Sequence, residues 1–387
     1  MSPQKTALYD RHRQLGAKMT DFHGWEMPLY YTSILDEHRA VRQALGIFDI
    51  SHMGQVFVTG PQASQTLNRL MTSDVSQLPQ GRACYTLMLN ESGGIIDDLI
   101  VYCIGPEAYL VIVNCANRAI DVAWMQSHGI GQTTIADLSE GRSIVAVQGP
   151  TACRVLEQVL DAKVTSLARF EIAPIRTMGP DACLARTGYT GSDGFELFLP
   201  DRHAVRVWDM VLAAAKPLGI QPIGLGARDT LRIEAGLRLY GTDMDSATSP
   251  WEVGLGWTVA INKPEFIGKS ALVQQRQTGV TRAFVGFELS QGPVPRTGTA
   301  LFAVSDGVPT RIGQVTSGTY SPVLAKPLGM GYVEPASAAP GTSVRFTVRN
   351  QWYTGTIVKL PFWKGDPRQP ALANSPTPGR LTTHVDS

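Results

Sequence analysis

The segment that decides the fold lies at residues 93–102 and reads Gly93-Gly-Ile-Ile-Asp97-Asp98-Leu-Ile-Val-Tyr102. Two adjacent carboxylates interrupt an apolar run that predicts a buried or half-buried strand. Successive side chains of a strand point to opposite faces, so only one of the two carboxylates can face a given cavity. Burial and a neighbouring like charge both raise the pKa of a carboxyl group. One of these groups could therefore hold a proton or accept a hydrogen bond from a reacting amine, the alternative being two solvated acids at a strand end.

Strand and helix patterns surround this segment without strict alternation. One strand-like run begins at Leu99 within this segment, and others, each bounded by Gly, Pro, Asn or Asp, begin at Val56, Tyr109 and Ile144. Helical periodicity covers residues 33–44, 116–128, 151–160 and 204–215. Helices and strands mixed in this way favour an α+β fold over a doubly wound sheet.

The sequence pattern changes toward the C-terminal end of the chain. From about Arg282, short β-like runs alternate with Gly and Pro turns, a pattern typical of a small barrel or sandwich. After Trp363 the chain carries four prolines and few apolar residues, which predicts a disordered tail. We therefore expect an α+β region over residues 1–275, a C-terminal β-barrel domain over 276–365 and a disordered tail over 366–387.

Length and charge exclude several classes of protein. The 387 residues are typical of two or three domains of about 100–200 residues each. The 34 Lys and Arg and 33 Asp and Glu leave a net charge of +1, so no global field favours nucleic acid or anionic lipid. No apolar run approaches the ~20 residues needed to span a bilayer. We expect neither a nucleic-acid partner nor a membrane-spanning segment.

Common catalytic signatures also fail. Lys263 stands where a phosphate-binding P-loop ending at residues 268–270 needs glycine, and Thr190 stands where a nucleophile elbow at 190–194 needs one. The seven histidines form no HExxH motif, so no metal site is expected. The five cysteines form no C-x-x-C pair, and the N-terminus lacks the apolar core of a signal peptide. Core cysteines in a cytoplasmic protein are the expectation.

A second segment that could carry chemistry is Arg186-Thr-Gly-Tyr189-Thr-Gly-Ser-Asp-Gly-Phe-Glu196-Leu-Phe-Leu. Its three glycines make a turn that side chains do not block, and a strand follows. Glu196 interrupts an apolar stretch, where its carboxylate could accept paired hydrogen bonds from a planar amino-heterocycle while Tyr189 stacks or closes the pocket. The alternative is an exposed strand face with a solvated glutamate.

A third segment, residues 224–241, places Arg228, Asp229 and Arg232 near one expected helix start. The planar fork of arginine suits a carboxylate or a carbonyl-bearing ring. The alternative is an internal salt-bridge cluster that packs two lobes together, and we favour that alternative for Arg232 and Glu234.

Taken together, these three segments resemble the glycine cleavage system T-protein family of aminomethyltransferases. Four more segments fit the same family: residues 21–31, 46–54, 147–150 and 316–322. The similarity runs from about Thr6 to Lys364. It implies a three-lobed α+β fold around a central folate-binding cavity, ending in a β-barrel lobe.

The resemblance also implies a reaction and its participants. An aminomethyl group on the lipoyl arm of the H-protein is split: ammonia leaves, the methylene passes to tetrahydrofolate, and dihydrolipoyl H-protein is released. Tetrahydrofolate is thus a co-substrate, the lipoylated H-protein a partner, and no metal is required. Protein groups mainly place the reactants, and a carboxylate beside a developing ammonium adds electrostatic stabilisation.

Site residues follow from the family by motif position. Asp98 is expected to orient and activate the reacting folate nitrogen, with Asp97 as the alternative that strand alternation leaves open. Glu196 resembles the acceptor at the pterin edge and Arg228 a folate-binding cation. The expected cavity lining comprises Tyr85, Tyr189, Tyr240, Asn114 and Met53. Some relatives carry an arginine where this chain has Lys364, and we assign that lysine no role.

Other folate proteins share the fold that the resemblance implies. A tetrahydrofolate-dependent demethylase of a small methylated compound would use the same cavity and is the alternative function. Oxidases with a folate domain are much longer and carry a flavin domain. A non-catalytic folate protein of iron–sulfur assembly would carry a cysteine motif near residues 228–240, where this chain has no cysteine.

Overall fold

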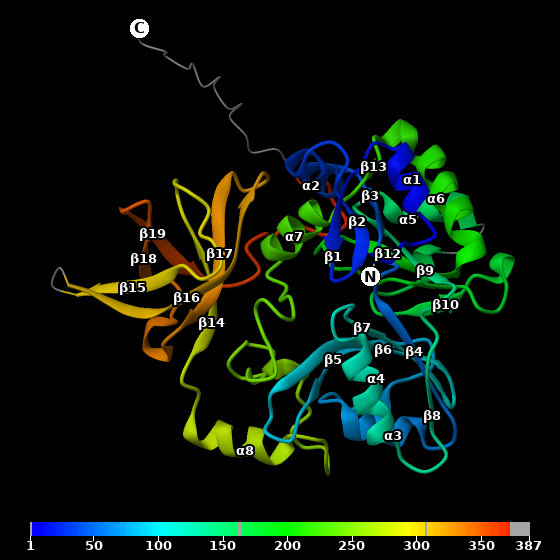
Figure 1. Ribbon diagram of the computed structural model, residues 1–387, viewed down its shortest axis with the longest axis horizontal. Helices are drawn as coiled ribbons and strands as arrows, with labels where there is room; N and C mark the ends of the chain where they lie inside the picture. Colours follow the sequence, from blue (N-terminus) through cyan, green and yellow to red (C-terminus); the bar gives the residue numbers. More distant parts are fainter. Residues whose placement is uncertain (1, 161–163, 306–307, 372–387) are drawn as a thin grey trace, which may run out of the picture.

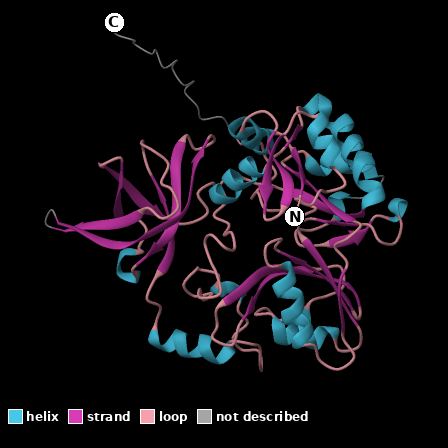
Figure 2. Ribbon diagram, viewed as in Figure 1, coloured by secondary structure: helices cyan, strands magenta, loops and turns pink. Residues whose placement is uncertain are grey.

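The computed structural model describes residues 2–160, 164–305 and 308–371. Three lobes lie around a group of central loops (Figure 1): a five-stranded sheet below, a six-stranded sheet at the upper right and a barrel at the left. Helices cover the outer faces of the two open sheets, whereas the barrel is almost entirely strand (Figure 2).

The first lobe is an antiparallel sheet of order β5-β6-β7-β4-β8. Its strands are β4 (Gly54–Thr59), β5 (Ala83–Leu89), β6 (Ile95–Gly105), β7 (Ala108–Val113) and β8 (Thr134–Asp137). Helices α3 (Ala63–Leu70) and α4 (Arg118–Ser127) cover one face. Leu67 of α3 and Met125 of α4 share a buried core with strand residues of that face. The other face turns toward the second sheet.

Strand β6 carries the Asp97-Asp98 segment, and its alternation separates the two carboxyl groups. Leu99 belongs to the core beneath α3 and α4, whereas Tyr102 belongs to the core between the two sheets. Asp97 shares the parity of Leu99, and Asp98 shares that of Tyr102. Asp97 therefore points toward the helices and Asp98 toward the centre of the molecule.

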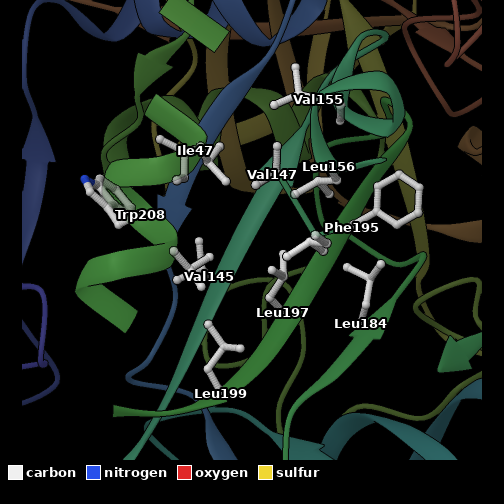
Figure 3. Packing of buried hydrophobic residues seen from close by; sticks show 14 of the residues in the cluster. Ile47, Val145, Val147, Val155, Leu156, Leu184, Phe195, Leu197, Leu199 and Trp208 are labelled. Carbon is white, nitrogen blue, oxygen red and sulfur yellow. The ribbon is translucent and has the colours of Figure 1, made fainter. Parts of the chain in front are cut away.

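The second lobe is a sheet of order β10-β11-β12-β9-β3-β13, antiparallel except for the β13–β3 pair. Its strands are β3 (Gly46–Asp49), β9 (Arg142–Gln148), β10 (Ile172–Pro174), β11 (Cys183–Ala185), β12 (Gly194–Pro200) and β13 (Gln221–Pro222). Helices α5 (Ala152–Leu160) and α6 (Asp201–Ala215) pack on one face. Figure 3 shows Val145 and Leu197 of that face in one buried cluster with Trp208 of α6. Glu196 has the opposite parity and faces the core between the sheets.

The third lobe is a closed barrel of order β14-β17-β16-β15-β18-β19. Its strands are β14 (Ala283–Glu288), β15 (Ala300–Ser305), β16 (Val308–Ser321), β17 (Lys326–Val333), β18 (Ser343–Val348) and β19 (Gln351–Val358). This architecture confirms the α+β fold with a C-terminal barrel. The domain division stays a prediction, and its boundary at residues 275–276 falls inside helix α8 (Lys269–Thr278).

The remaining elements connect the lobes. They are α1 (Tyr9–Gln14), the hairpin β1 (Lys18–Phe22) and β2 (Trp25–Tyr30), α2 (Ile34–Gln43) and α7 (Leu225–Glu234). Helix α7 contacts α2 on one side and barrel strands β16 and β17 on the other. It thereby ties the second lobe to the barrel.

Hydrogen bonds of two buried charged side chains on α7 make that connection. Arg232 donates to Asp229 at 2.8 Å, to Asp243 at 2.5 Å and to Ser317 of β16 at 2.8 Å. Glu234 accepts from Arg42 of α2 at 2.7 Å and from the Ser321 hydroxyl at the end of β16. The structural interpretation of Arg232 and Glu234 is therefore confirmed.

The C-terminal segment leaves the barrel and returns to the second lobe. In the predicted tail, residues 366–371 are described, and two backbone hydrogen bonds join them to the body: Asp193 N–H to Pro367 O at 2.9 Å and Ala371 N–H to Arg42 O at 3.0 Å. Residues 372–387 lie outside the described residues. Across the described ranges, no helix is both long and apolar enough to cross a bilayer.

Candidate active site

Asp98 is the carboxyl group that faces the centre of the molecule. Its Oδ2 accepts a hydrogen bond from the Tyr85 hydroxyl at 2.9 Å, and its Oδ1 accepts one from Asn114 Nδ2 at 3.0 Å. Burial, together with the adjacent charge of Asp97, raises the pKa of Asp98 to about 7, although the bonds from Tyr85 and Asn114 oppose the shift. Asp98 can therefore gain or lose a proton near neutral pH.

Asp97 lies on the other face of β6, fully buried under α4. It accepts hydrogen bonds from the backbone N–H of Asn114 at 2.9 Å, from Asn114 Nδ2 at 2.8 Å and from Asn117 Nδ2 at 3.1 Å. The amide of Asn114 thus bridges both carboxyl groups. Asp97 thus supports Asp98 from behind and does not face the centre of the molecule.

Arg228, in the first turn of α7, lies over the ring of Tyr189 with its guanidinium carbon 4.7 Å from the ring centroid. The Tyr189 hydroxyl donates to the carbonyl of Arg238, which fixes the ring. Within the described ranges, the guanidinium of Arg228 forms neither a hydrogen bond nor an ion pair. Burial lowers its pKa, while Tyr189 and Glu196 oppose that shift. A half-buried arginine without an anion is prepared to bind one from outside.

Glu196, on β12, faces the core between the sheets and is only 9% exposed. Its Oε2 accepts from the Thr187 hydroxyl at 2.6 Å and from the Tyr102 hydroxyl at 3.4 Å. No donor among the described residues reaches Oε1. Burial raises the pKa of Glu196, against the hydroxyl of Thr187 and the charge of Arg228. One carboxylate oxygen is thus held and the other is available to a ligand.

Tyr189 connects these groups into one site. Burial raises its pKa, and the charges that act on it include those of Asp98 and Arg228. Arg228 in turn acts on Glu196. We call the set Tyr85, Asp98, Asn114, Tyr189, Glu196 and Arg228 the central cluster.

Two predicted positions, and Lys364, to which no role is assigned, lie outside the central cluster. Tyr240 lies beside Asp97 and Asn117, and burial followed by the charge of Asp97 raises its pKa to about 12. Met53 packs, partly buried, at the edge of the core between the sheets. Lys364 is exposed near the end of the described chain.

Sequence reasoning missed three residues beside the cluster. His52 is buried, and burial together with Arg228 lowers its pKa to about 3, so the ring is neutral. Trp257 is 72% exposed and stacks on Tyr85 with ring centroids 5.8 Å apart. Asp121 lies under Asp97. The i,i+4 spacing of Asn117 and Asp121 on a helix was the available signal for that last residue.

The donor set of the central cluster defines what it can bind. Glu196 offers a carboxylate oxygen to N–H groups, Tyr189 an aromatic face and Arg228 an unpaired cation. Asp98 adds a carboxyl group that titrates near neutrality. This combination fits a planar, amino-substituted heterocycle that carries an anionic or carbonyl group. Two surface cavities, of about 320 and 400 Å³, are lined by other residues.

Comparison with known proteins agrees with this geometry. Residues 8–263 match the GCVT N-terminal domain, and residues 282–364 match the glycine cleavage T-protein C-terminal barrel domain. The aminomethyltransferase of Halothermothrix orenii is 44% identical over 93% of this chain and 99% of its own. That of Thermotoga maritima is 40% identical over 95% and 99%.

A solved structure shows the same fold. The glycine cleavage system aminomethyltransferase T from Bartonella henselae superposes with a TM-score of 0.88 at 34% identity, covering 94% of this chain and 99% of its own. The chain therefore belongs to the glycine cleavage T-protein family of aminomethyltransferases.

Proposed function

We propose that this chain transfers the methylene group of an aminomethyl-lipoyl H-protein to tetrahydrofolate. The methylene carbon exchanges its bonds to sulfur and to the amino nitrogen for two bonds to folate nitrogens. The two protons displaced from those nitrogens leave on ammonia and on the lipoyl thiol. The observation that carries the proposal is the oriented carboxyl group of Asp98, whose pKa is raised to about 7, near the same Tyr189 on whose ring the guanidinium of Arg228 lies.

Asp98 is the residue we assign to the reacting nitrogen. The hydrogen bonds from Tyr85 and Asn114 fix both of its oxygens, so the carboxyl group is oriented before substrate arrives. With a pKa of about 7, Asp98 can ionise near neutral pH and then accept a proton or stabilise a developing ammonium. Orientation of two reactants supplies about 7–11 kcal/mol of barrier reduction at best. Asp97 serves as its support.

The rest of the central cluster is assigned to binding tetrahydrofolate. Glu196 Oε1 accepts from the amino edge of the heterocycle, and Tyr189 packs against its plane. Arg228 supplies the cation for a carbonyl or carboxylate of the same ligand. Tyr85, Tyr240, Asn114 and Met53 are proposed to line the remaining space.

The test is ammonia release from aminomethyl-loaded H-protein by the purified chain, measured with and without tetrahydrofolate. We expect tetrahydrofolate to accelerate release strongly and methylene-tetrahydrofolate to accumulate in equal amount. Tight folate binding without acceleration would overturn the proposal. In that case small methylated compounds would be tested as donors.

A further inference from the structure

Asp121 is a buried carboxyl group that the proposed reaction does not use directly. It lies in the first turn of α4, fully buried, and Asn117 lies one turn earlier on the same helix. No N–H or hydroxyl donor in the described part of the chain bonds to either of its oxygens. An ionised carboxylate in such a place would lack all compensation for its lost hydration.

The partner of Asp121 is another carboxyl group. Asp121 and Asp97 lie within hydrogen-bonding reach of each other, and two carboxyl groups can form such a bond only by sharing a proton. Burial, the charge of Asp97 and its hydrogen bond raise the pKa of Asp121 to about 11. The pair therefore carries one proton across the neutral range.

The surrounding hydrogen bonds decide which residue holds that proton. Asp97 accepts three N–H bonds, from the backbone and side chain of Asn114 and from Asn117, which favours its ionised form. Asp121 accepts none of this kind, which favours its neutral form. The proton thus belongs to Asp121, which donates it to Asp97.

The charge on Asp97 matters for Asp98. It is the second cause, after burial, of the raised pKa of Asp98. Asp97 also holds the Asn114 amide that donates to Asp98. If Asp97 took up the proton, Asp98 would lose the repulsive charge and ionise at lower pH.

We propose that Asp121 is a positioning residue: a neutral carboxylic acid whose proton is donated to Asp97, which keeps Asp97 ionised behind Asp98. The infrared experiment below does not depend on the proposed function. The effect on Asp98 is measured through the activity, and that part of the inference rests on the proposed function.

Other titratable groups of the described residues lie near the pair. Asp98 lies on the same strand, Tyr85 reaches Asp98 from β5, and Tyr240 reaches Asn117 from the segment after α7. Asp245 acts on Tyr240 from that same segment. Arg118, at the start of α4, donates to Asp137 at 2.6 Å. Asp98 is therefore the group expected to report the charge of Asp97.

The first experiment is the infrared difference spectrum between the wild-type chain and Asp121→Asn at pH 9. At this pH Asp98 is ionised, since its pKa is about 7, and Asp121 is still protonated, since its pKa is about 11. We expect a protonated-carboxyl band in the wild type that the variant lacks. Its absence from the wild type would overturn the proposal, whatever the chain catalyses.

The second experiment is the pH profile of tetrahydrofolate-dependent ammonia release. Asp121→Asn exchanges one neutral donor for another, so its acid limb should coincide with that of the wild type. Asp97→Asn, the matched control, removes the charge and should move the limb to lower pH by about 1–2 units, the effect of one close charge. A downward shift in Asp121→Asn would show that Asp121 is ionised and would overturn the proposal.

A third variant removes the donor. Asp121→Leu should move the acid limb downward as Asp97→Asn does, because Asp97 without its donor takes up a proton. Lower turnover with an unmoved limb would indicate a merely structural residue and would contradict the proposal. If Asp121→Leu does not fold, Asp121→Asn and Asp97→Asn still test whether Asp121 is neutral. A wild-type chain with the infrared band but no tetrahydrofolate-dependent release would contradict the proposed function alone.

Discussion

Two ends of the same helix, α7, treat their charged side chains in opposite ways. At its C-terminal end, Arg232 and Glu234 are saturated: each is buried and bonded to groups from α2, from the loop at Asp243 or from barrel strand β16. At its N-terminal end, Arg228 is stacked on Tyr189 and, within the described ranges, has no anionic partner. The same residue type thus sits in two different environments one turn apart.

The difference separates structure from function. A buried charge whose bonds are all internal stabilises one arrangement of the lobes, and removal of its partner costs stability. A half-buried charge left without an internal partner lowers stability and persists where a ligand completes it. The saturated end of α7 should therefore respond to mutation in unfolding experiments, and the central cluster in binding and turnover.

The largest effect is expected at Asp98. Asp98→Asn keeps the shape of the side chain and removes its ability to accept a proton, so turnover should fall by about 10²–10⁴. Folate affinity and the unfolding free energy should change little. Steady-state ammonia release and calorimetric folate binding measure the two quantities. Equal losses in turnover and affinity would make Asp98 a plain binding residue.

At the saturated end, Glu234→Ala leaves Arg42 buried without its partner. We expect the unfolding free energy to fall by about 3–5 kcal/mol, measured by urea denaturation. The matched control is Asp36→Ala, which breaks the exposed pair with Arg39 at 2.8 Å and should cost at most about 1 kcal/mol. If the folded fraction of Glu234→Ala bound folate less tightly, the two ends of α7 would not differ in function as proposed.

The two regions should also respond to pH in different windows. Burial alone would raise the pKa of Glu234, but His38, Arg42 and Ser321 outweigh it and lower that pKa to about 2. Since this folded-state pKa lies below the unfolded value, Glu234 stabilises the fold above pH 4.5 and loses that effect as the pH falls toward 2. Asp98 has a raised pKa, so kcat/KM should instead fall below about pH 7. Coincident loss of activity and of folded structure on acidification would contradict this separation.

The smallest effect is expected at Tyr85. Its hydroxyl donates to Asp98 and favours the ionised carboxyl group, so Tyr85→Phe should raise the pKa of Asp98. The acid limb of the activity profile should move to higher pH by less than about one unit, the size of one neutral hydrogen bond. A shift to lower pH would mean that Tyr85 favours the protonated form.

Sequence patterns predicted the helices and strands well because the spacing of apolar residues reflects which side of each element is buried. The segment at Asp97-Asp98 was predicted to be a strand, and parity placed the two carboxyl groups on opposite faces. What parity could not show is which face looks inward, because that depends on α4 covering one side of β6. The structural interpretation of Arg232 and Glu234 is confirmed, whereas the roles of the predicted site residues stay proposals.

His52 and Trp257 could not be predicted as neighbours of the site, and for Asp121 only its i,i+4 spacing from Asn117 gave a signal. Each is brought there by packing between segments far apart in the sequence, such as α4 against β6 and residue 257 against β5. An isolated aspartate in the first turn of a helix is normally explained by its favourable interaction with the helix dipole. The pairing of Asp121 with Asp97, which only the structure shows, indicates a different role.

The most direct test compares Arg228→Gln with Arg232→Gln, two equal substitutions one turn apart on α7. Folate affinity and unfolding free energy would be measured for both. We expect Arg228→Gln to lose about 10–100-fold in affinity, the value of a hydrogen bond to a charged group, with no loss of stability. Arg232→Gln should lose about 3–5 kcal/mol of stability while its folded fraction binds folate normally. Loss of the same quantity in both variants would contradict the account.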